Sequence, residues 1–268
     1  MNRHSYTAIV AFIVAIAVFI ATYAFLPRTS NAPGNTAVSY KVAPSGDPTG
    51  SVVIPISLVT VRKNAPTSAS INIEYPTFPS MPEELNTAIA SSVSSRLEDF
   101  YKVVALNSAA RDATANNPPG KPGASIPPNA YSFIATWQEA QINNRYVSFI
   151  IRFDSYAGGA NENQEVETFN YDVSAKKLMS LPDLFPAAPN YLDQLSKLSR
   201  QQLSDSLRTA SPGYDPVAML DAGTEPTADN FHNFTFTDYA VTLYFPKYAV
   251  APGAFGEQRV TISMNSVK

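Results

Sequence analysis

The sequence predicts an α+β fold in which antiparallel strands pack with two main helices, preceded by an N-terminal transmembrane helix. Three observations lead to this prediction. An uncharged apolar run occupies residues 7–26, two later segments carry apolar residues at three- and four-residue steps, and the remaining strand-length segments alternate apolar and polar residues. The strands follow one another in hairpin-like runs instead of alternating singly with helices, and this order favours α+β over a doubly wound sheet.

The apolar run TAIVAFIVAIAVFIATYAFL is long enough to cross a membrane. At about 1.5 Å per residue it spans the roughly 30 Å hydrocarbon core of a bilayer. Tyr6 and Tyr23 lie near its two ends, and Pro27 stops the helix. The run exceeds the roughly 7–15 apolar residues of a cleavable signal peptide. We therefore expect a retained signal anchor in the cell membrane, with residues 1–6 as a cytoplasmic tail and the bulk of the chain extracytoplasmic.

Residues 27–50 are rich in Pro, Gly, Ser and Thr and are expected to form a stalk. The ectodomain is predicted to comprise an N-terminal part, residues 51–142, and a C-terminal part, residues 143–268. The first part begins with strands at 52–61 and 70–75. A helix then starts near Pro82, and its apolar stripe consists of Leu85, Ile89, Val93, Leu97, Phe100 and Val104. The Pro- and Gly-rich segment 116–129 is expected to be a loop.

The C-terminal part is predicted to continue with a hairpin. Strands at 131–142 and 145–156 flank Asn143-Asn144, a dipeptide that tolerates a tight turn. A further strand is expected at 164–173, followed by a helix at 189–207. The remaining predicted strands are at 231–236, 240–245 and 259–264.

The composition excludes several classes of chemistry. The chain has no cysteine, which excludes a disulfide framework, a thiol nucleophile and a thiolate metal site. Of its two histidines, His4 lies in the expected tail and His232 alone remains for the ectodomain, so we predict no metal, no cofactor and no catalytic residue. The net charge of −3 without a basic stripe gives no reason to expect a nucleic-acid partner.

Three blocks of sequence resemble a known extracellular module. They are IEYPTFPS…LNTAI at 73–89, SFIIRFDSYAGGAN…NYDV…LMSLPDLF at 148–185, and NFHNFTFTDYAVTLYFPKYAVAPGAFGEQRVTI at 230–262. Together they resemble the tandem region of unknown function found in the anti-sigma factor RsiV and in front of the catalytic domain of PdaC-type peptidoglycan deacetylases. For the RsiV type the resemblance implies lysozyme binding. That family usually has His where this chain has Asn161, and only six residues precede the expected span here, too few for a sigma-binding domain.

The corner after the strand at 145–156 supplies most of the candidate binding residues. They are Tyr156, Gly158, Gly159 and Asn161, together with Tyr248 beside a later Pro-containing turn. A diglycine lets the backbone turn where a Cβ would clash. Tyr156 and Tyr248 flank such turns and are the better surface candidates, whereas most of the other aromatic residues alternate with smaller residues on strands and are expected in the core or in cross-strand pairs.

Three functions remain open at this point. The first is a non-enzymatic binding or sensing module for a cell-wall glycan such as peptidoglycan, or for an envelope protein such as lysozyme. The second is a hydrolase of envelope polysaccharide that uses Glu165 and Glu167, which share one strand face; a solvated polar face is the alternative explanation of that pair. The third is a scaffold for a separately encoded envelope partner.

Overall fold

The computed structural model describes residues 38–41, 54–64, 69–115 and 130–268. The expected tail, the apolar run at 7–26, most of the expected stalk and the predicted loop at 116–129 lie outside these ranges. Within them, no helix combines the length and the apolar character needed to cross a bilayer. The predicted α+β class, with largely antiparallel sheets and helices, is confirmed.

A large sheet of seven strands follows the chain order from β1 to β7. Its strands are β1 (Val38–Lys41), β2 (Pro55–Asn64), β3 (Ala69–Thr77), β4 (Tyr131–Ile142), β5 (Tyr146–Tyr156), β6 (Asn163–Asp172) and β7 (Lys177–Leu178). Neighbours pair antiparallel except β3 and β4, which are parallel. Helix α2 (Glu83–Ala115) lies between those two strands in the chain, and such a helical crossover permits parallel pairing.

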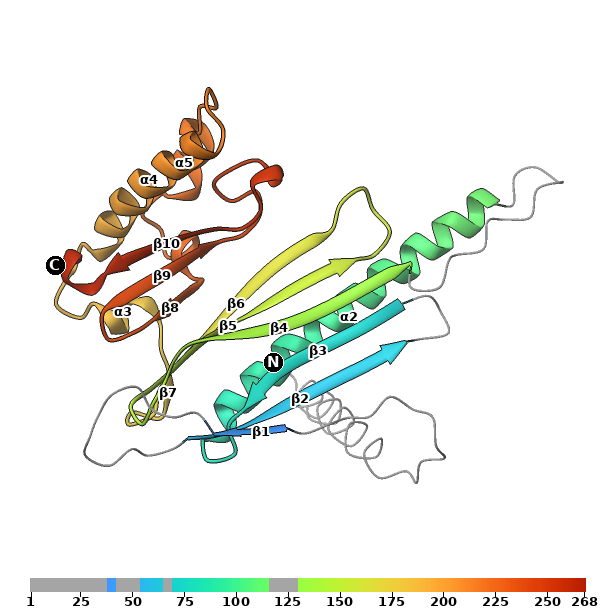
Figure 1. Ribbon diagram of the computed structural model, residues 1–268, viewed down its shortest axis with the longest axis horizontal. Coiled ribbons are helices and arrows are strands. Elements are labelled where there is room, and N and C mark those ends of the chain that lie inside the picture. Colours follow the sequence, from blue (N-terminus) through green and yellow to red (C-terminus); the bar gives the residue numbers. More distant parts are fainter. Residues whose placement is uncertain (1–37, 42–53, 65–68, 116–129) are drawn as a thin grey trace, which may run out of the picture. The chain divides into compact units, whose positions relative to one another are not determined.

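Helix α2 runs along the strands of the large sheet (Figure 1). The predicted apolar stripe forms the core here, since Leu85, Ile89, Val93 and Phe100 are buried together with residues of β3, β4 and β5. The segment before the helix is fixed by Asn86, whose side chain accepts a hydrogen bond from the Phe78 amide at 2.8 Å and donates to the Phe78 carbonyl at 2.9 Å. These two hydrogen bonds satisfy both the amide and the carbonyl of Phe78, just after the end of β3.

A small sheet of three strands has the order β10-β9-β8. Its strands are β8 (Phe234–Phe236), β9 (Ala240–Phe245) and β10 (Gln258–Ser263), and its helices are α3 (Leu181–Leu184), α4 (Tyr191–Ala210) and α5 (Val217–Gly223). Figure 1 shows α4 lying along this sheet. The leucines of α4 that were expected to face inward include Leu195, Leu203 and Leu207, which are buried in one apolar core with β9 and β10.

Several boundaries differ from the sequence prediction, and three of these differences bear on the architecture. Strand β1 lies within the expected stalk and pairs with β2. The expected division at residues 142/143 falls in the turn between β4 and β5, and these two strands pair along almost their whole length, so the large sheet continues across it. Strand β8 begins later than expected because Asp229–Phe231 forms a 3₁₀ turn, η1, instead of extended chain.

Side chains of β5 and β6 join the large sheet to the small one. Ser148 and Asn170 are buried and hydrogen-bonded to each other at 2.7 Å. The Phe236 amide donates to Ser148 Oγ at 2.9 Å, and Asn170 Nδ2 donates to the Phe234 carbonyl at 2.8 Å. Strand β8 is the edge of the small sheet, so these side chains satisfy backbone groups that no neighbouring strand bonds. We call this set, with the Arg152 contacts described next, the sheet junction.

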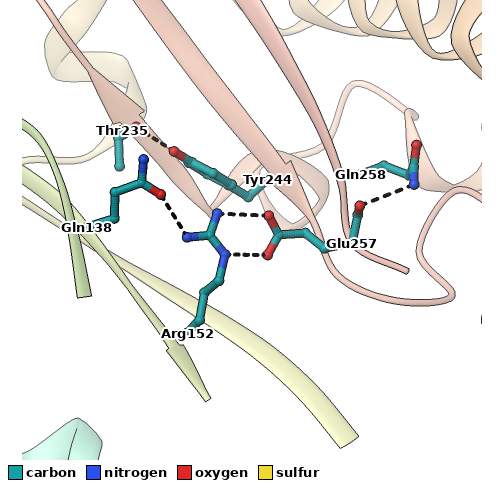
Figure 2. A network of polar contacts seen from close by, with 6 residues as sticks. All are labelled: Gln138, Arg152, Thr235, Tyr244, Glu257 and Gln258. Carbon is teal, nitrogen blue, oxygen red and sulfur yellow. Dashed lines mark hydrogen bonds and ion pairs between the residues drawn. The ribbon is translucent and has the colours of Figure 1, made fainter. Parts of the chain in front are cut away.

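An arginine completes the sheet junction (Figure 2). Arg152 on β5 holds Glu257 through two hydrogen bonds, Nε to Oε2 at 3.2 Å and Nη2 to Oε1 at 3.1 Å. Its third nitrogen donates to Gln138 Oε1 at 3.1 Å. The guanidinium also lies 5.7 Å from the centroid of the Tyr244 ring, whose hydroxyl meets Thr235 Oγ1 at 3.1 Å. The two-pronged arginine–carboxylate geometry fixes orientation as well as charge.

Candidate functional site

The chain turns sharply between β5 and β6, at the diglycine singled out in the sequence. Gly158 has a φ of +92°, a left-handed backbone conformation that residues with a Cβ rarely adopt. Gly159 is different, because a Cβ built there would meet only the Asn161 carbonyl oxygen, at an ordinary 3.9 Å. The backbone therefore requires glycine at 158 and leaves room for a side chain at 159.

A pocket of about 450 Å³ lies between this turn and helix α2. The helix contributes Ser95, Arg96, Asp99, Phe100, Val103 and Asn107, and the strands and the turn contribute Phe133, Phe153, Ser155, Ala157, Gly159, Asn161, Asn163 and Glu165. We call it the α2–corner pocket. Its volume falls within the roughly 300–1,000 Å³ typical of small-molecule sites.

Three phenylalanines form the apolar part of the lining. The ring centroids of Phe100 and Phe133 are 5.5 Å apart, and those of Phe133 and Phe153 are 6.2 Å apart. All three side chains are buried in the core of the large sheet. Because tilted ring pairs of this kind are held by packing on both sides, they provide a pre-formed wall.

Arg96 is the one positively charged side chain among the lining residues of the pocket. Its Nη1 lies 2.8 Å from Glu167 Oε2, and its Nε lies 3.2 Å from Glu165 Oε2. The guanidinium also lies over the Phe153 ring, 4.8 Å from its centroid. Glu165 and Glu167 do share one strand face, as the sequence indicated, but that face meets α2. Ser92 donates a further hydrogen bond to Glu167, so the helix holds both carboxylates.

Amide side chains make up the rest of the polar rim. Asn107 donates from Nδ2 to the Ala157 carbonyl at 2.6 Å and so ties the helix to the turn. Asn163 donates to Glu165 Oε1 at 2.7 Å. Asn161 is exposed and lines the pocket, and within the described residues its side-chain amide has no hydrogen-bond partner. The rim thus offers one uncommitted amide beside several fixed groups.

The structure places the five predicted binding residues in three different settings. Gly159 and Asn161 line the pocket, whereas Tyr156 and Gly158 flank Ala157 without lining it. Tyr248 belongs to a separate loop, is 57% exposed, and has a positive φ of 74°. Its ring lies so close to Gly253 that a Cβ there would come within 2.3 Å of it.

The expected exposure of the tyrosines holds in part. Tyr131 and Tyr171 are buried as expected, and Tyr248 is exposed. Tyr239, just before the predicted strand at 240–245, is 81% exposed and is the most exposed large apolar side chain of the described residues. It precedes β9 in a turn, where its side chain is outside the alternation of the strand.

Sequence reasoning missed the helix side of the pocket. Arg96, Asp99, Val103 and Asn107 follow one another at three- and four-residue steps, so a second, polar stripe was visible beside the apolar one. Nothing in the sequence indicated which segment that stripe faces, because the Asn107–Ala157 contact joins residues fifty positions apart.

Helix α2 carries further charged side chains near the pocket. Lys102 is exposed and contacts Asp99 Oδ1 at 3.0 Å and Glu98 Oε1 at 3.2 Å. The hydrogen bonds that Lys102 donates to Asp99 and then to Glu98 raise the pKa of Lys102 above its usual value. Throughout the part of the chain that the structure describes, no three His, Asp or Glu side chains cluster in a way that could hold a metal ion.

Comparison with known proteins finds a family model that matches part of the C-terminal region. Residues 182–265 match the family described as "Protein of unknown function (DUF3298)". The chain is also 33% identical over 122 residues to the peptidoglycan-N-acetylmuramic acid deacetylase PdaC of Bacillus subtilis (strain 168), a match that covers 46% of this chain and 25% of that protein. These matches confirm the resemblance to a module of unknown function shared with PdaC.

Two solved structures are also similar. A DUF3298 family protein from Pseudomonas aeruginosa PAO1 has a TM-score of 0.47 at 16% identity, covering 80% of this chain and 94% of that one. A member of the same family from Bacteroides fragilis NCTC 9343 has a TM-score of 0.47 at 13% identity, covering 87% of this chain and 90% of that one.

Proposed function

We propose that this chain is a non-catalytic module that binds a cell-wall glycan in the α2–corner pocket, and that it is anchored in the cell membrane by residues 7–26 with the folded part outside. The observation that carries the proposal is the combination of a 450 Å³ pocket, a wall of three phenylalanines and a rim of amide and charged side chains. The similarity to PdaC supports a cell-wall setting.

The chemistry of the lining suits a sugar. A pyranose ring has apolar C–H faces, which pack on aromatic rings, and an edge of hydroxyl groups that both donate and accept hydrogen bonds. In the pocket, Phe100 and Phe153 are lining residues whose rings are largely buried, so they offer a ligand a small aromatic area, and the exposed Asn161 amide offers both a donor and an acceptor at the rim. Placed polar groups beside an apolar wall are typical of sites that orient small ligands, and in this pocket polar side chains outnumber apolar ones among the lining residues.

Hydrolysis through Glu165 and Glu167 has less support. A glycosidase needs two carboxyl groups flanking the bond that it breaks. Here Glu165 lines the pocket but Glu167 does not, and both are bound to Arg96. Glu167 also accepts a hydrogen bond from Ser92, which holds it on the helix side. The pair is therefore better explained as a support that fixes Arg96 beside the pocket.

Co-sedimentation with purified peptidoglycan sacculi tests the proposal. The full chain, kept in a mild detergent, should pellet saturably with sacculi, and no muropeptides should appear in the supernatant. Asn161→Ala should weaken pelleting without changing the thermal melt, because no described residue of the protein bonds to this side chain. Asn144→Ala is the matched control, since Asn144 is an exposed asparagine in the turn at the other end of β5.

Each other result has a definite meaning. Equal pelleting of wild type and Asn161→Ala would remove the pocket from the proposal. Release of muropeptides by the wild type, abolished in Glu165→Gln, would establish the hydrolase instead. Absence of pelleting would contradict glycan binding, and an envelope protein such as lysozyme would then be the partner to test. The mass of the protein recovered from cell membranes would show separately whether residues 7–26 are retained.

A further inference from the structure

The residues that line the α2–corner pocket include more negative than positive side chains. Arg96 is the one cation among its lining residues, and it already contacts both Glu165 and Glu167. Two carboxylates, Asp99 and Glu165, line the same pocket. Lys102 lies outside the lining, is fully exposed, and contacts Asp99 through Oδ1. The lining therefore presents more negative charge than its cation neutralises.

This imbalance has a consequence for the ligand. A carboxylate or phosphate entering the pocket would compete with Glu165 and Glu167 for Arg96 and would meet Asp99 as a like charge. A cation would instead find carboxylates on both walls, Asp99 on the helix and Glu165 on β6. It would share Glu165 with Arg96 and Asn163. It would share Asp99 with Lys102, which contacts Oδ1 alone. Hydrogen bonds from an ammonium group to a carboxylate are shorter and stronger than those between neutral groups.

We propose that the pocket prefers an amino sugar with a free, protonated amine over the same sugar in its N-acetylated form. This inference rests on the glycan-binding function proposed above and adds the class of sugar. The ammonium group would lie between Asp99 and Glu165, while the ring packs against the phenylalanine wall. An acetamido group at the same position carries no charge and gains nothing from either carboxylate.

Oligomers of β-linked glucosamine and of N-acetylglucosamine, equal in length, are the probes. Titration calorimetry with the full chain is done at about pH 6, where carboxylates are ionised and amines carry their proton. We expect the glucosamine oligomer to bind about five- to tenfold more tightly, as partly exposed charge pairs allow. The preference should shrink in high salt, because both carboxylates are open to solvent.

Two neighbouring carboxylates on α2 provide a matched pair of variants. Asp99 and Glu98 both contact Lys102 and are similarly exposed, but only Asp99 lines the pocket. Asp99→Asn should lower the preference for the glucosamine oligomer to about twofold or less, whereas Glu98→Gln should leave it unchanged. Thermal melts of both variants should match the wild type, because neither side chain is buried.

The outcomes separate this inference from the proposed function. Equal affinity for the two oligomers would overturn the inference and leave glycan binding in place. Absence of binding to either oligomer, together with failure to pellet with sacculi, would overturn both. An equal loss of preference in Asp99→Asn and Glu98→Gln would show that the overall charge of the helix acts, not the pocket, and would also overturn the inference.

Discussion

Each face of the β5–β6 hairpin carries an arginine bound to a carboxylate, but one of these sites lies beside an open pocket and the other lies between the two sheets. On the face toward α2, Arg96 contacts Glu165 and Glu167 beside an open pocket. On the opposite face, Arg152 contacts Glu257 and Gln138 where the small sheet covers the large one (Figure 2). Each arginine also lies over an aromatic ring, Phe153 or Tyr244.

The polar side chains on the two faces of the hairpin differ in burial and in hydrogen bonding, and this difference indicates whether they serve stability or binding. At the sheet junction, Ser148 and Asn170 bond to the backbone of β8 and are buried, so the junction has no room for a ligand. At the α2–corner pocket, Asn161 lines unfilled volume and has no side-chain hydrogen-bond partner in the part of the chain that the structure describes. Substitutions at the junction should therefore change stability, and substitutions at the pocket rim should change binding.

The largest effect is expected from Asn170→Ala at the sheet junction. The substitution leaves the Ser148 hydroxyl and the Phe234 carbonyl without their partner in a buried setting. Unsatisfied buried groups of this kind cost about 2–3 kcal/mol of unfolding free energy. Urea unfolding should show that loss, and Asn72→Ala, at an exposed asparagine on β3, should show almost none. If Asn170→Ala lost no more unfolding free energy than Asn72→Ala, the junction would contribute little to stability.

A smaller effect is expected for the ion pair of the junction. Arg152→Met, Glu257→Gln and the double variant form a cycle that isolates the coupling between the two side chains. Since their side chains are 27% and 20% exposed, we expect a coupling of about 1 kcal/mol, above that of surface pairs. The unfolding free energies of the four proteins measure it. A coupling near zero would mean that this ion pair contributes nothing to the attachment of the small sheet.

The two glycines of the corner should respond differently. Gly158→Ala should destabilise the protein by about 1 kcal/mol, because alanine is strained at a φ of +92°. Gly159→Ala should have almost no effect on the melt, because its Cβ would enter free space. Thermal melts of both variants test this. If Gly159→Ala proved the more harmful, the geometry described for the corner would be wrong.

A carboxylate outside both regions provides the smallest expected effect and a reference for them. Asp183 in α3 contacts Lys177 at 2.6 Å and bonds to the Ser180 amide at 2.8 Å. The hydrogen bond from Lys177, followed by that from the Ser180 backbone, lowers the pKa of Asp183 from 3.8 to about 2. A carboxylate with a lowered pKa stabilises the fold above its unfolded pKa, and this contribution is lost as the pH falls toward the folded value.

Asp183→Asn should therefore reduce the unfolding free energy by about 0.5–1 kcal/mol above pH about 4, and the difference should fade as the pH approaches about 2. Urea unfolding of both proteins at a series of pH values measures this difference. A difference that stays constant over the whole series would contradict an electrostatic origin.

Local features of the sequence were enough to predict most elements. Strands at 131–142 and 240–245 were predicted with the bounds that the structure has, because turn residues border a clear alternation on each side. The apolar stripe of α2 was also recognised, and it forms the core. The run Ser148–Phe153 was read as an apolar strand, but its burial on both faces follows from the small sheet, which the hairpin pattern does not reveal.

The sequence predicted the turn residues of the pocket but not its helix residues. The diglycine indicated the corner with Gly159 and Asn161, because glycine carries a local conformational signal. Arg96 and Asn107 were not found, since their roles depend on contacts with Glu165 and Ala157 that are distant in the sequence. The parallel pairing of β3 and β4 was missed for the same reason, because it depends on where α2 returns the chain.

The most direct test of the central claim is to map a bound sugar by amide chemical-shift changes. The full chain, labelled with nitrogen-15, is titrated with the glucosamine oligomer. The account predicts shifts at the Asn107 and Asn161 side-chain amides and at the Gly159 backbone amide, with the Asn170 side chain at the sheet junction unchanged. Shifts confined to the junction, or to the loops of Tyr239 and Tyr248, would contradict it.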